Sequence, residues 1–419
     1  MSPKPGSQYT VVAGDTLSSI AERAYGFASL WPRIKQANQG QFKVDNPDDI
    51  TVGQVLNIPL EPDLNKLKTE LAATRLANKK IGDLTILING TETFYTSARV
   101  VRTMDTLADG WSASIPWIPG LDHALDDKLK PFSYPPASVY IGSDLIINGI
   151  LYLHNPTITT GGIINNIEGW SYTADAIDST IKPPYEKNNL TLEQIATELA
   201  ASLGIKALFD FDSGGAFKRT TASPSDTIFS YLSKLATQRN LILTSTNNGD
   251  MLFTRTTESN SVGTLQEGDA IILGLNAVYD GRQRYNAYRV IGQSPLITSP
   301  KVGIANDNNV LRSRFLTFEA DEIERGEVVN VAEWKRSTQI AKALEIPVQT
   351  EGWFDPKGEL WKPNTRVNLI SNTLSLPKGF EFVIKRVEYE LTENSQVATL
   401  SLVPPSVFTG EDLKDPWGQ

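Results

Sequence analysis

The residue types that could carry catalysis are scarce in this chain. It has no cysteine and only two histidines, His123 and His154. The absence of cysteine excludes disulfides, thiolate nucleophiles and Cys-ligated metal centres. Neither histidine lies in an HExxH or HxH pattern, so we expect none of the zinc sites used by common wall-cutting amidases and endopeptidases. We expect His123 to be a solvated surface residue and His154 to end a strand.

Paired carboxylates are the remaining route to catalysis. Acidic residues adjoin at Asp48-Asp49, at Asp126-Asp127 and in the run EADEIE. A glycosidase needs two carboxylates that face one cleft, and their separation cannot be derived from a sequence. Solvated loop charge is the plainer interpretation of all three. We therefore expect no catalytic residue, no cofactor and no metal, and a carboxylate glycosidase survives only as an alternative.

Composition limits the other classes of function. The chain has 419 residues, a net charge of −9 and ordinary hydrophobic and charged fractions of 40% and 21%. This length predicts about three domains. The acidic balance argues against nucleic-acid recognition, which needs a clustered basic surface. The start MSPKPGSQ lacks the apolar core of a signal peptide, and no run of about 18 apolar residues predicts membrane insertion.

Residues 8–60 have the pattern of a small strand–helix–helix–strand module. The stretch YTVVAG alternates apolar and polar residues and breaks at Gly14, which predicts a short strand and a turn. Asp15 and Thr16 then offer oxygens that can cap a helix. The apolar positions that follow have helical spacing, Gly26 ends that helix, and Pro32 begins a second one. A turn at Gly53 leads into the last strand.

This module resembles a LysM domain over its whole length. The resemblance rests on these residues: Tyr9, Val11, Gly14, Asp15, Thr16, Leu17, Ile20, Ala21, Tyr25, Gly26, Ile34, Ala37, Asn38, Ile50, Gly53, Leu56, Ile58 and Pro59. It implies binding of glycans that contain N-acetylglucosamine, as in peptidoglycan, through two loops. The positions it implies here are Gly14, Asp15, Thr16, Leu17, Asp49, Ile50 and Thr51. A purely structural role, with the same residues as turns, caps and core, remains open and is slightly favoured.

The rest of the chain alternates between strand-rich and helix-rich segments. After a helical linker at 61–82, residues 83–180 predict short strands with turns at Asn89-Gly90, Gly142 and Asn148-Gly149. Residues 181–265 predict an α+β insert, in which LTLEQIATELAASLG and DTIFSYLSKLATQ have helical spacing. Residues 266–405 return to strands, and 406–419 predict an exposed tail. The predicted fold class is α+β and multidomain: a βααβ LysM module followed by two β-barrel-like modules that flank an α+β insert.

That order of modules is similar to the baseplate hub proteins of contractile phage tails, especially those of phage Mu, and to the VgrG proteins of type VI secretion. The resemblance rests on the helical pair quoted above and on GELWKPNTRVNLISN, GFEFVIKRVEYEL and ATLSLVPP. It implies a homotrimer that joins a sixfold tail tube to a threefold spike. The implied partners are tube or distal tail proteins, the spike and wedge proteins, and the implied location is the virion, assembled in the host cytoplasm.

Three hypotheses follow from these patterns. The first is a structural hub with LysM as a peptidoglycan contact or a structural clip, and it predicts no enzyme. The second is a cell-wall hydrolase with LysM targeting, and the third is a secreted wall adhesin, which the missing signal peptide disfavours. Two segments, WSASIPWIPG and EGWFDPKGELWKP, combine aromatic residues with proline. We expect their tryptophans to be core or interface anchors, namely Trp111, Trp117, Trp353 and Trp361.

Overall fold

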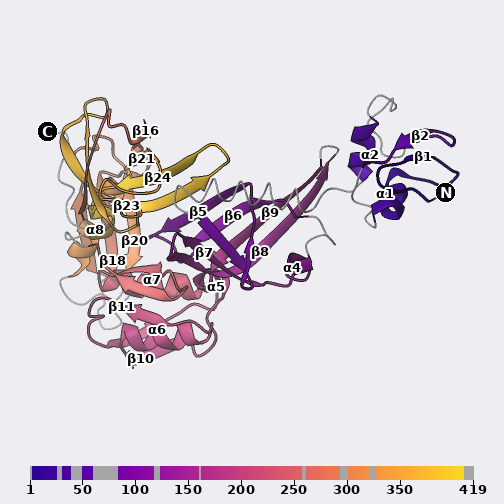
Figure 1. The fold of residues 1–419 in the computed structure, drawn as a ribbon. Coiled ribbons are helices and arrows are strands. Elements are labelled where there is room, and N and C mark those ends of the chain that lie inside the picture. The colour runs from indigo at the N-terminus through magenta and orange to yellow at the C-terminus, as the bar shows by residue number, and fades with distance from the viewer. Residues whose placement is uncertain are drawn as a thin grey trace. The chain divides into compact units, whose positions relative to one another are not determined.

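The computed structural model describes residues 2–25, 31–38, 50–59, 84–117, 123–159, 162–256, 261–292, 301–320 and 327–409. The predicted linker at 61–82 lies outside these residues. The chain divides into two compact units. The first contains Met1–Ser97, Ser112–Asp144 and Leu151–Glu168, and the second contains Ala98–Trp111, Leu145–Ile150 and Gly169–Gln419. The mixed helix and strand class expected from the sequence is confirmed (Figure 1).

The N-terminal module has the predicted strand–helix–helix–strand order. Its elements are β1 (Gln8–Thr10), α1 (Leu17–Tyr25), α2 (Trp31–Ala37) and β2 (Val55–Asn57). The two strands pair antiparallel, with Tyr9 opposite Leu56. The core is formed by Tyr9, Val11, Leu17, Ile20, Ala21, Tyr25, Ile34, Leu56 and Ile58. Because every member comes from this module, it has a hydrophobic core of its own.

The first unit continues with short antiparallel strands. They are β3 (Leu84–Ile88), β4 (Thr91–Thr93) and β7 (Pro136–Ile141), and α4 (His123–Asp126) precedes β7. Strand β3 lies between β4 and β7 and pairs with both. The predicted turn between β3 and β4 is confirmed, because Asn89 and Gly90 have φ of 47° and 75°. Such positive φ values belong to the tight hairpin turns that Asn-Gly favours.

Three longer strands contribute residues to both units: β6 (Gly110–Ile115), β8 (Asp144–Thr159) and β9 (Gly162–Ser171). The predicted turn at Asn148-Gly149 is wrong, because β8 runs straight through it. A Cβ at Gly149 would lie 1.8 Å from the Trp170 carbonyl oxygen, so the glycine allows a close backbone approach instead. His154 also lies inside β8, so its expected place at a strand end is wrong as well.

The predicted α+β insert is present in the second unit. It contains β10 (Glu186–Leu190), α6 (Leu192–Ala201), β11 (Ala207–Phe209), β12 (Phe217–Thr221), α7 (Ile228–Gln238), β13 (Ile242–Ser245) and β14 (Met251–Thr254), after α5 (Asp175–Asp178). Thr191 and Thr227 cap the two longer helices, and Thr191 forms a capping box with Gln194. Both helices bury one apolar face in a common core. Local cap chemistry and apolar spacing therefore determine this part.

The main sheet of the second unit has the strand order β16-β21-β24-β23-β5, and β22 lies between β23 and β15. The strands are β5 (Ser97–Thr103), β15 (Ser261–Gln266), β16 (Ile272–Leu275), β17 (Val278–Tyr279), β21 (Leu344–Glu351), β22 (Arg366–Ser371), β23 (Leu376–Leu391) and β24 (Gln396–Val403). The strands β22, β23 and β24 confirm the strand-rich character expected near the end of this segment. All four tryptophans that were expected to be core or interface anchors are buried.

A smaller sheet is covered by a helix in the second unit. It consists of β18 (Ala287–Gly292), β19 (Lys301–Asn306) and β20 (Phe315–Ala320), and α8 (Glu327–Lys342) packs against it. A Cβ at Gly303 would lie 2.3 Å from the Val328 carbonyl oxygen, so the glycine permits this close packing. The short helix α9 (Ser406–Thr409) packs on α8, and Ser406 and Val407 are buried. The expectation of an exposed tail is therefore wrong for these first residues.

Candidate functional site

The two loops named as a glycan site lie next to each other in the N-terminal module. The Val11 amide donates to the Gln54 carbonyl and the Gly53 amide donates to the Val11 carbonyl, both at 2.8 Å. Gly14 and Gly53 have φ of 89° and 90°, and no atom lies within 4 Å of the place where either Cβ would be. Each loop can turn sharply there because glycine tolerates positive φ.

Asp15 closes the first loop instead of facing outward. Its carboxylate accepts hydrogen bonds from the Val12 amide (2.9 Å) and from the Tyr9 hydroxyl (2.8 Å), and it forms an ion pair with Arg23. Only 6% of its side chain is exposed. The expected helix cap at Asp15 is not observed, since its carboxylate oxygens bind the loop and a side chain further along the helix. A sugar hydroxyl would find this carboxylate already occupied.

The charged form of Asp15 is favoured by its neighbours. Burial by itself raises the pKa of a carboxyl group, but here the Val12 amide, the Tyr9 hydroxyl and Arg23 outweigh it, so the pKa of Asp15 is lowered. Burial and the neighbouring carboxylate raise the pKa of Tyr9. The guanidinium of Arg23 also lies 5.5 Å from the Tyr9 ring centroid. Asp15 is thus ionised and hydrogen-bonded, which suits a structural group and not a general acid.

Thr16 and Leu17 also serve the module itself. Thr16 caps α1, because its hydroxyl accepts from the Ser19 amide (3.1 Å) while the Ser19 hydroxyl accepts from the Thr16 amide (3.0 Å). This reciprocal pair satisfies two amides that the helix leaves unbonded. Leu17 is completely buried in the module core. The predicted helix cap at Thr16 is confirmed, and the Leu17 side chain is placed away from any ligand.

The second loop is more exposed than the first. Ile50 is half-buried and packs on the module core, whereas Thr51 is exposed and its amide donates to the Gln54 side chain at 3.0 Å. Asp49, which the resemblance also implied, lies outside the described residues. The structure therefore brings Gly14, Thr51 and their backbone groups to one rim, where shallow contacts are available.

Sequence reasoning missed three apolar residues on this rim. Val12, Val52 and Val55 are exposed, and Val52 has 69% of its surface accessible. The alternation of YTVVAG carried the signal, because Tyr9 and Val11 point inward and Val12 must then point outward. Exposed aliphatic side chains are a surface on which the apolar face of a sugar ring can lie.

His154, the histidine whose side chain is described, packs within the first unit. The Nδ1 atom of His154 lies 2.9 Å from the Leu129 carbonyl oxygen, and its ring meets the Trp117 ring edge-on at 5.0 Å between centroids. These contacts make His154 a packing residue of the first unit. His123 begins α4, and its side chain is outside the described set. Within the described residues, no three His, Cys, Asp or Glu side chains could hold a metal ion together.

Models of known families match three parts of the chain. The model of the LysM domain matches residues 9–59, the model of the second domain of gp44-like baseplate hub proteins matches 173–255, and the model of the fourth domain of the Mu phage baseplate assembly protein GpP matches 326–411. The chain carries a LysM domain and Mu gp44-like baseplate hub domains. The resemblances found in the sequence are thereby confirmed.

Relatives extend this result over the hub body. The baseplate hub protein gp44 of Escherichia phage Mu is 26% identical over 75% of this chain and 86% of its own length. The fold is similar to the 43 kDa tail protein of prophage MuSo2 from Shewanella oneidensis, with a TM-score of 0.67 and 23% identity over 78% of this chain and 99% of that one. A PdpA–VgrG complex from Francisella has a TM-score of 0.50 and 11% identity, over 84% of this chain and 63% of that one.

The phage Mu and MuSo2 relatives are a baseplate hub protein and a tail protein, which agrees with a location in the virion. No described helix is long and apolar enough to cross a membrane. The hub domains therefore account for most of the chain after residue 172, and the LysM domain is an addition before them.

Proposed function

We propose that this baseplate hub protein acts as a homotrimer that joins the sixfold tail tube to the threefold spike of a contractile phage tail. In this proposal residues 83–180 and 266–405 are the two β-barrel-like modules of each subunit, and 181–265 is the insert between them. Three copies then supply six modules to the tube and one threefold ring to the spike. Tube, spike and wedge proteins are its partners, and the protein catalyses no reaction.

The proposal is best supported by two findings taken together: two family models of baseplate hub domains match the chain, and its fold is similar to that of a prophage tail protein. The match to gp44 of phage Mu covers 86% of that protein, so the likeness extends to nearly the whole relative and not to one shared motif. In the LysM domain, the Asp15 carboxylate is bonded to the Val12 amide, the Tyr9 hydroxyl and Arg23, which agrees with a role in the fold. Interfaces, and not a cleft, are then the places where this protein would act.

The homotrimer is tested by measuring the mass of the purified full chain with light scattering across a range of concentrations. A mass of three copies is expected at high concentration or on addition of the spike protein. A chain that stays monomeric in both conditions contradicts the adapter role. A cryo-electron microscopy map of the tail tip, with threefold density between tube and spike, is the direct confirmation.

For the LysM domain we propose contact with peptidoglycan at the rim formed by Gly14, Thr51, Val12 and Val52. Backbone groups and these small side chains would make the contact, since Asp15 and Leu17 are used by the fold. Retention of residues 8–60 on purified peptidoglycan tests this, and the isolated module suits the test because its core is self-contained. Loss of retention in Val52→Ser supports the rim, and no retention of the native module supports a structural clip.

The alternative of a cell-wall hydrolase is tested separately. Zymography of the full chain on peptidoglycan is expected to give no clear zone. A clear zone that persists after a second purification would favour a carboxylate glycosidase over a purely structural hub. The mass of the protein in the same preparation should be measured, so that a contaminating hydrolase is not mistaken for activity of this chain.

A further inference from the structure

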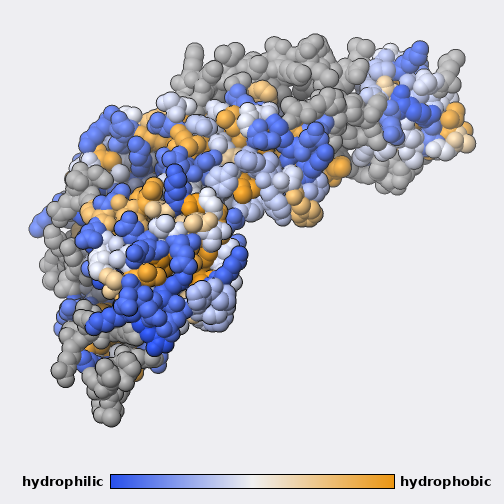
Figure 2. Space-filling model, turned by 90° about the horizontal axis from the view of Figure 1, so that it is seen from below, coloured by the Kyte–Doolittle hydropathy of each residue, from blue (hydrophilic) through white to orange (hydrophobic). Residues whose placement is uncertain are grey.

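The chain contains three Asn-Gly dipeptides, which begin at Asn89, Asn148 and Asn248. An asparagine side chain can react with the amide nitrogen of the next residue, and glycine allows this most readily because it has no Cβ to block the approach. Hydrophilic residues occur across the face shown in Figure 2, so exposure of an asparagine is not by itself a sign of reactivity. The surroundings of the following amide decide it, and they differ among the three dipeptides.

The Asn89-Gly90 turn leaves its reacting groups free. Both residues are exposed, and no atom lies within 4 Å of the place where a Gly90 Cβ would be. Among the described residues, none accepts a hydrogen bond from the Gly90 amide and none binds the Asn89 side chain. The Asn89 amide, in contrast, donates to the Pro136 carbonyl at 2.7 Å, which anchors the turn at its first residue. The Gly90 amide nitrogen and the side-chain carbonyl that it would attack are therefore both open to solvent.

The other two dipeptides hold their glycines inside the fold. Gly149 is buried within β8, and the Asn148 side chain donates to the Asn248 carbonyl at 3.2 Å. Gly249 is also buried, and its amide donates to the Thr246 carbonyl at 3.0 Å. An enclosed or bonded amide can approach the asparagine side chain only after the chain opens locally, which costs free energy.

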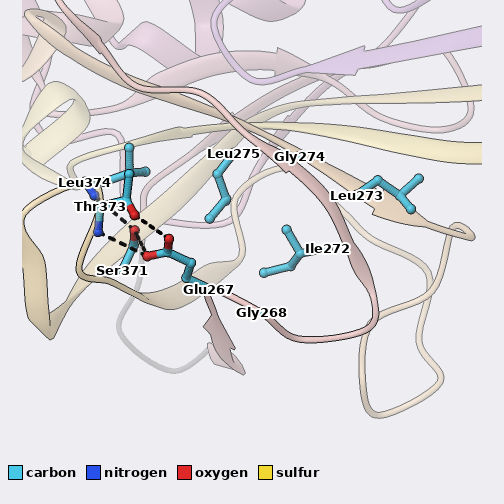
Figure 3. A pocket seen from close by; sticks show the side chains of 9 residues that line it. All are labelled: Glu267, Gly268, Ile272, Leu273, Gly274, Leu275, Ser371, Thr373 and Leu374. Carbon is cyan, nitrogen blue, oxygen red and sulfur yellow. Dashed lines mark hydrogen bonds between the residues drawn. The ribbon is translucent and has the colours of Figure 1, made fainter.

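Figure 3 shows such a bond after another asparagine. Asn372 is followed by Thr373, whose amide donates to the Glu267 carboxylate at 3.1 Å. This hydrogen bond fixes the amide nitrogen in the turn and directs its N–H away from the Asn372 side chain. The Gly90 amide has no such acceptor among the described residues, so it is free to react.

We propose that Asn89 is the site at which this chain deamidates. The Gly90 amide nitrogen bonds to the side-chain carbonyl carbon of Asn89, the bond from that carbon to the side-chain nitrogen breaks, and ammonia leaves with the amide proton. The product is a cyclic succinimide. Water then opens either carbonyl of the ring, which gives aspartate or isoaspartate. Water is the only co-reactant, and nothing is oxidised or reduced.

Isoaspartate at this position would break the hairpin. The turn contains only Asn89 and Gly90, and Ile88 pairs with Thr91 on its two sides. Isoaspartate leads the chain through its side chain, which adds one backbone atom to a turn whose register allows none. Strand β4 is the last in the described strand order, and it pairs with β3. Loss of the turn would therefore release β4 and expose Thr93, which is buried.

Peptide mapping by mass spectrometry tests the site. The folded full chain is kept in mildly alkaline buffer made with heavy-oxygen water and is then digested in ordinary water, so the label marks each side chain that converts during the incubation. Asn89 should gain the label about 10-fold faster than Asn148 or Asn248, because amides held by the fold react only after local opening. Equal rates, faster labelling at either of the other two, or no label at Asn89 would each overturn the inference.

The same incubation in concentrated urea separates the effect of the fold from that of the local sequence. In the unfolded chain the three dipeptides should take up label at similar rates, because glycine follows each asparagine. If Asn89 is favoured as strongly in urea as in the folded chain, the local sequence and not the fold selects it, and the inference fails.

The effect on the hairpin is tested with Asn89→Gly. This variant removes the reacting side chain and keeps a dipeptide that suits the same tight turn. After incubation, amide hydrogen exchange at residues 91–93 should be about 10-fold faster in the parent chain and unchanged in the variant. Labelling of Asn89 without faster exchange would overturn the loss of the hairpin and leave the reactive site standing. Equal acceleration in both chains would show that deamidation of Asn89 is not its cause.

Discussion

Asp15 in the LysM domain and Glu267 in the hub body both hold a turn, but each is stabilised differently. Asp15 is nearly buried and faces the cation Arg23, whereas Glu267 is exposed and faces only hydroxyl and amide donors. Hydrogen bonds from the Thr373 and Ser371 side chains and the Thr373 amide lower the pKa of Glu267 to about 2. The difference shows that a buried acid here has a counter-charge, while an accessible acid needs only neutral donors.

Replacement of Asp15 should produce the largest effect. Asp15→Asn removes the charge that Arg23 and the Tyr9 hydroxyl bind, and we expect the free energy of unfolding of residues 8–60 to fall by about 2 kcal/mol. Urea unfolding measures this loss. Glu22→Gln, an exposed change in the helix that follows, is the control and should stay within about 0.5 kcal/mol. Equal losses in both variants would show that Asp15 is not a structural acid.

The pH dependence of unfolding compares the two acids directly. Both folded-state pKa values are below those of free carboxyl groups, so each acid stabilises the fold above its unfolded pKa, and this stabilisation is lost as the pH falls. For Glu267 the loss should extend from about pH 4.5 down to about pH 2. Thermal unfolding at several pH values should therefore show a flatter acid limb in Glu267→Gln. An unchanged limb in that variant would mean that the hydrogen bonds of Glu267 contribute nothing.

Helix caps allow the same comparison at a smaller scale. Thr16→Ala in the LysM domain and Thr191→Ala in the insert each remove a hydroxyl that accepts from a helix amide. We expect about 1 kcal/mol of lost stability in each case. Chemical unfolding of the isolated LysM domain and of the full chain measures the two losses. A much larger loss at Thr16 would indicate that the first loop, and not only the helix, depends on it.

The smallest effect on stability should come from the glycan rim. Val52→Ser changes an exposed side chain, so the free energy of unfolding of the LysM domain should stay within about 0.5 kcal/mol. Retention on peptidoglycan should nevertheless fall. If both quantities are unchanged, the rim does not contact the wall and the domain is a structural clip.

Local patterns predicted much of the fold. The helices of the insert were predicted because their apolar residues have helical spacing, and Gly204, with a φ of 74°, follows the first of them. The Asn89-Gly90 turn was predicted because a tight turn needs the positive φ that these residues tolerate. Asn148-Gly149 is the same dipeptide inside strand β8, where the missing Cβ of the glycine allows the Trp170 backbone to approach closely. The dipeptide alone cannot distinguish a turn from such a close approach, because the approaching residue is distant in sequence.

The candidate site was predicted only in part. The LysM resemblance named two loops as the site, and that role stays a prediction. The helix cap expected at Asp15 is not observed, because its carboxylate binds the Val12 amide and Arg23, and Thr16 caps the helix instead. The rim residues Val12 and Val52 were missed although the alternation of the first strand implied that Val12 faces outward.

By itself the sequence determined the LysM domain and the helices of the insert, because these depend on residue spacing within a few turns of chain. Only the tertiary structure decided which polar side chains are hydrogen-bonded within the protein and which side chains are exposed to solvent. Glu267 meets Ser371 from 104 residues away, and their hydrogen bond exists only when those segments are folded together. Asn89-Gly90 is likewise one of three Asn-Gly dipeptides in the sequence, and only the fold leaves its glycine exposed while it buries the other two.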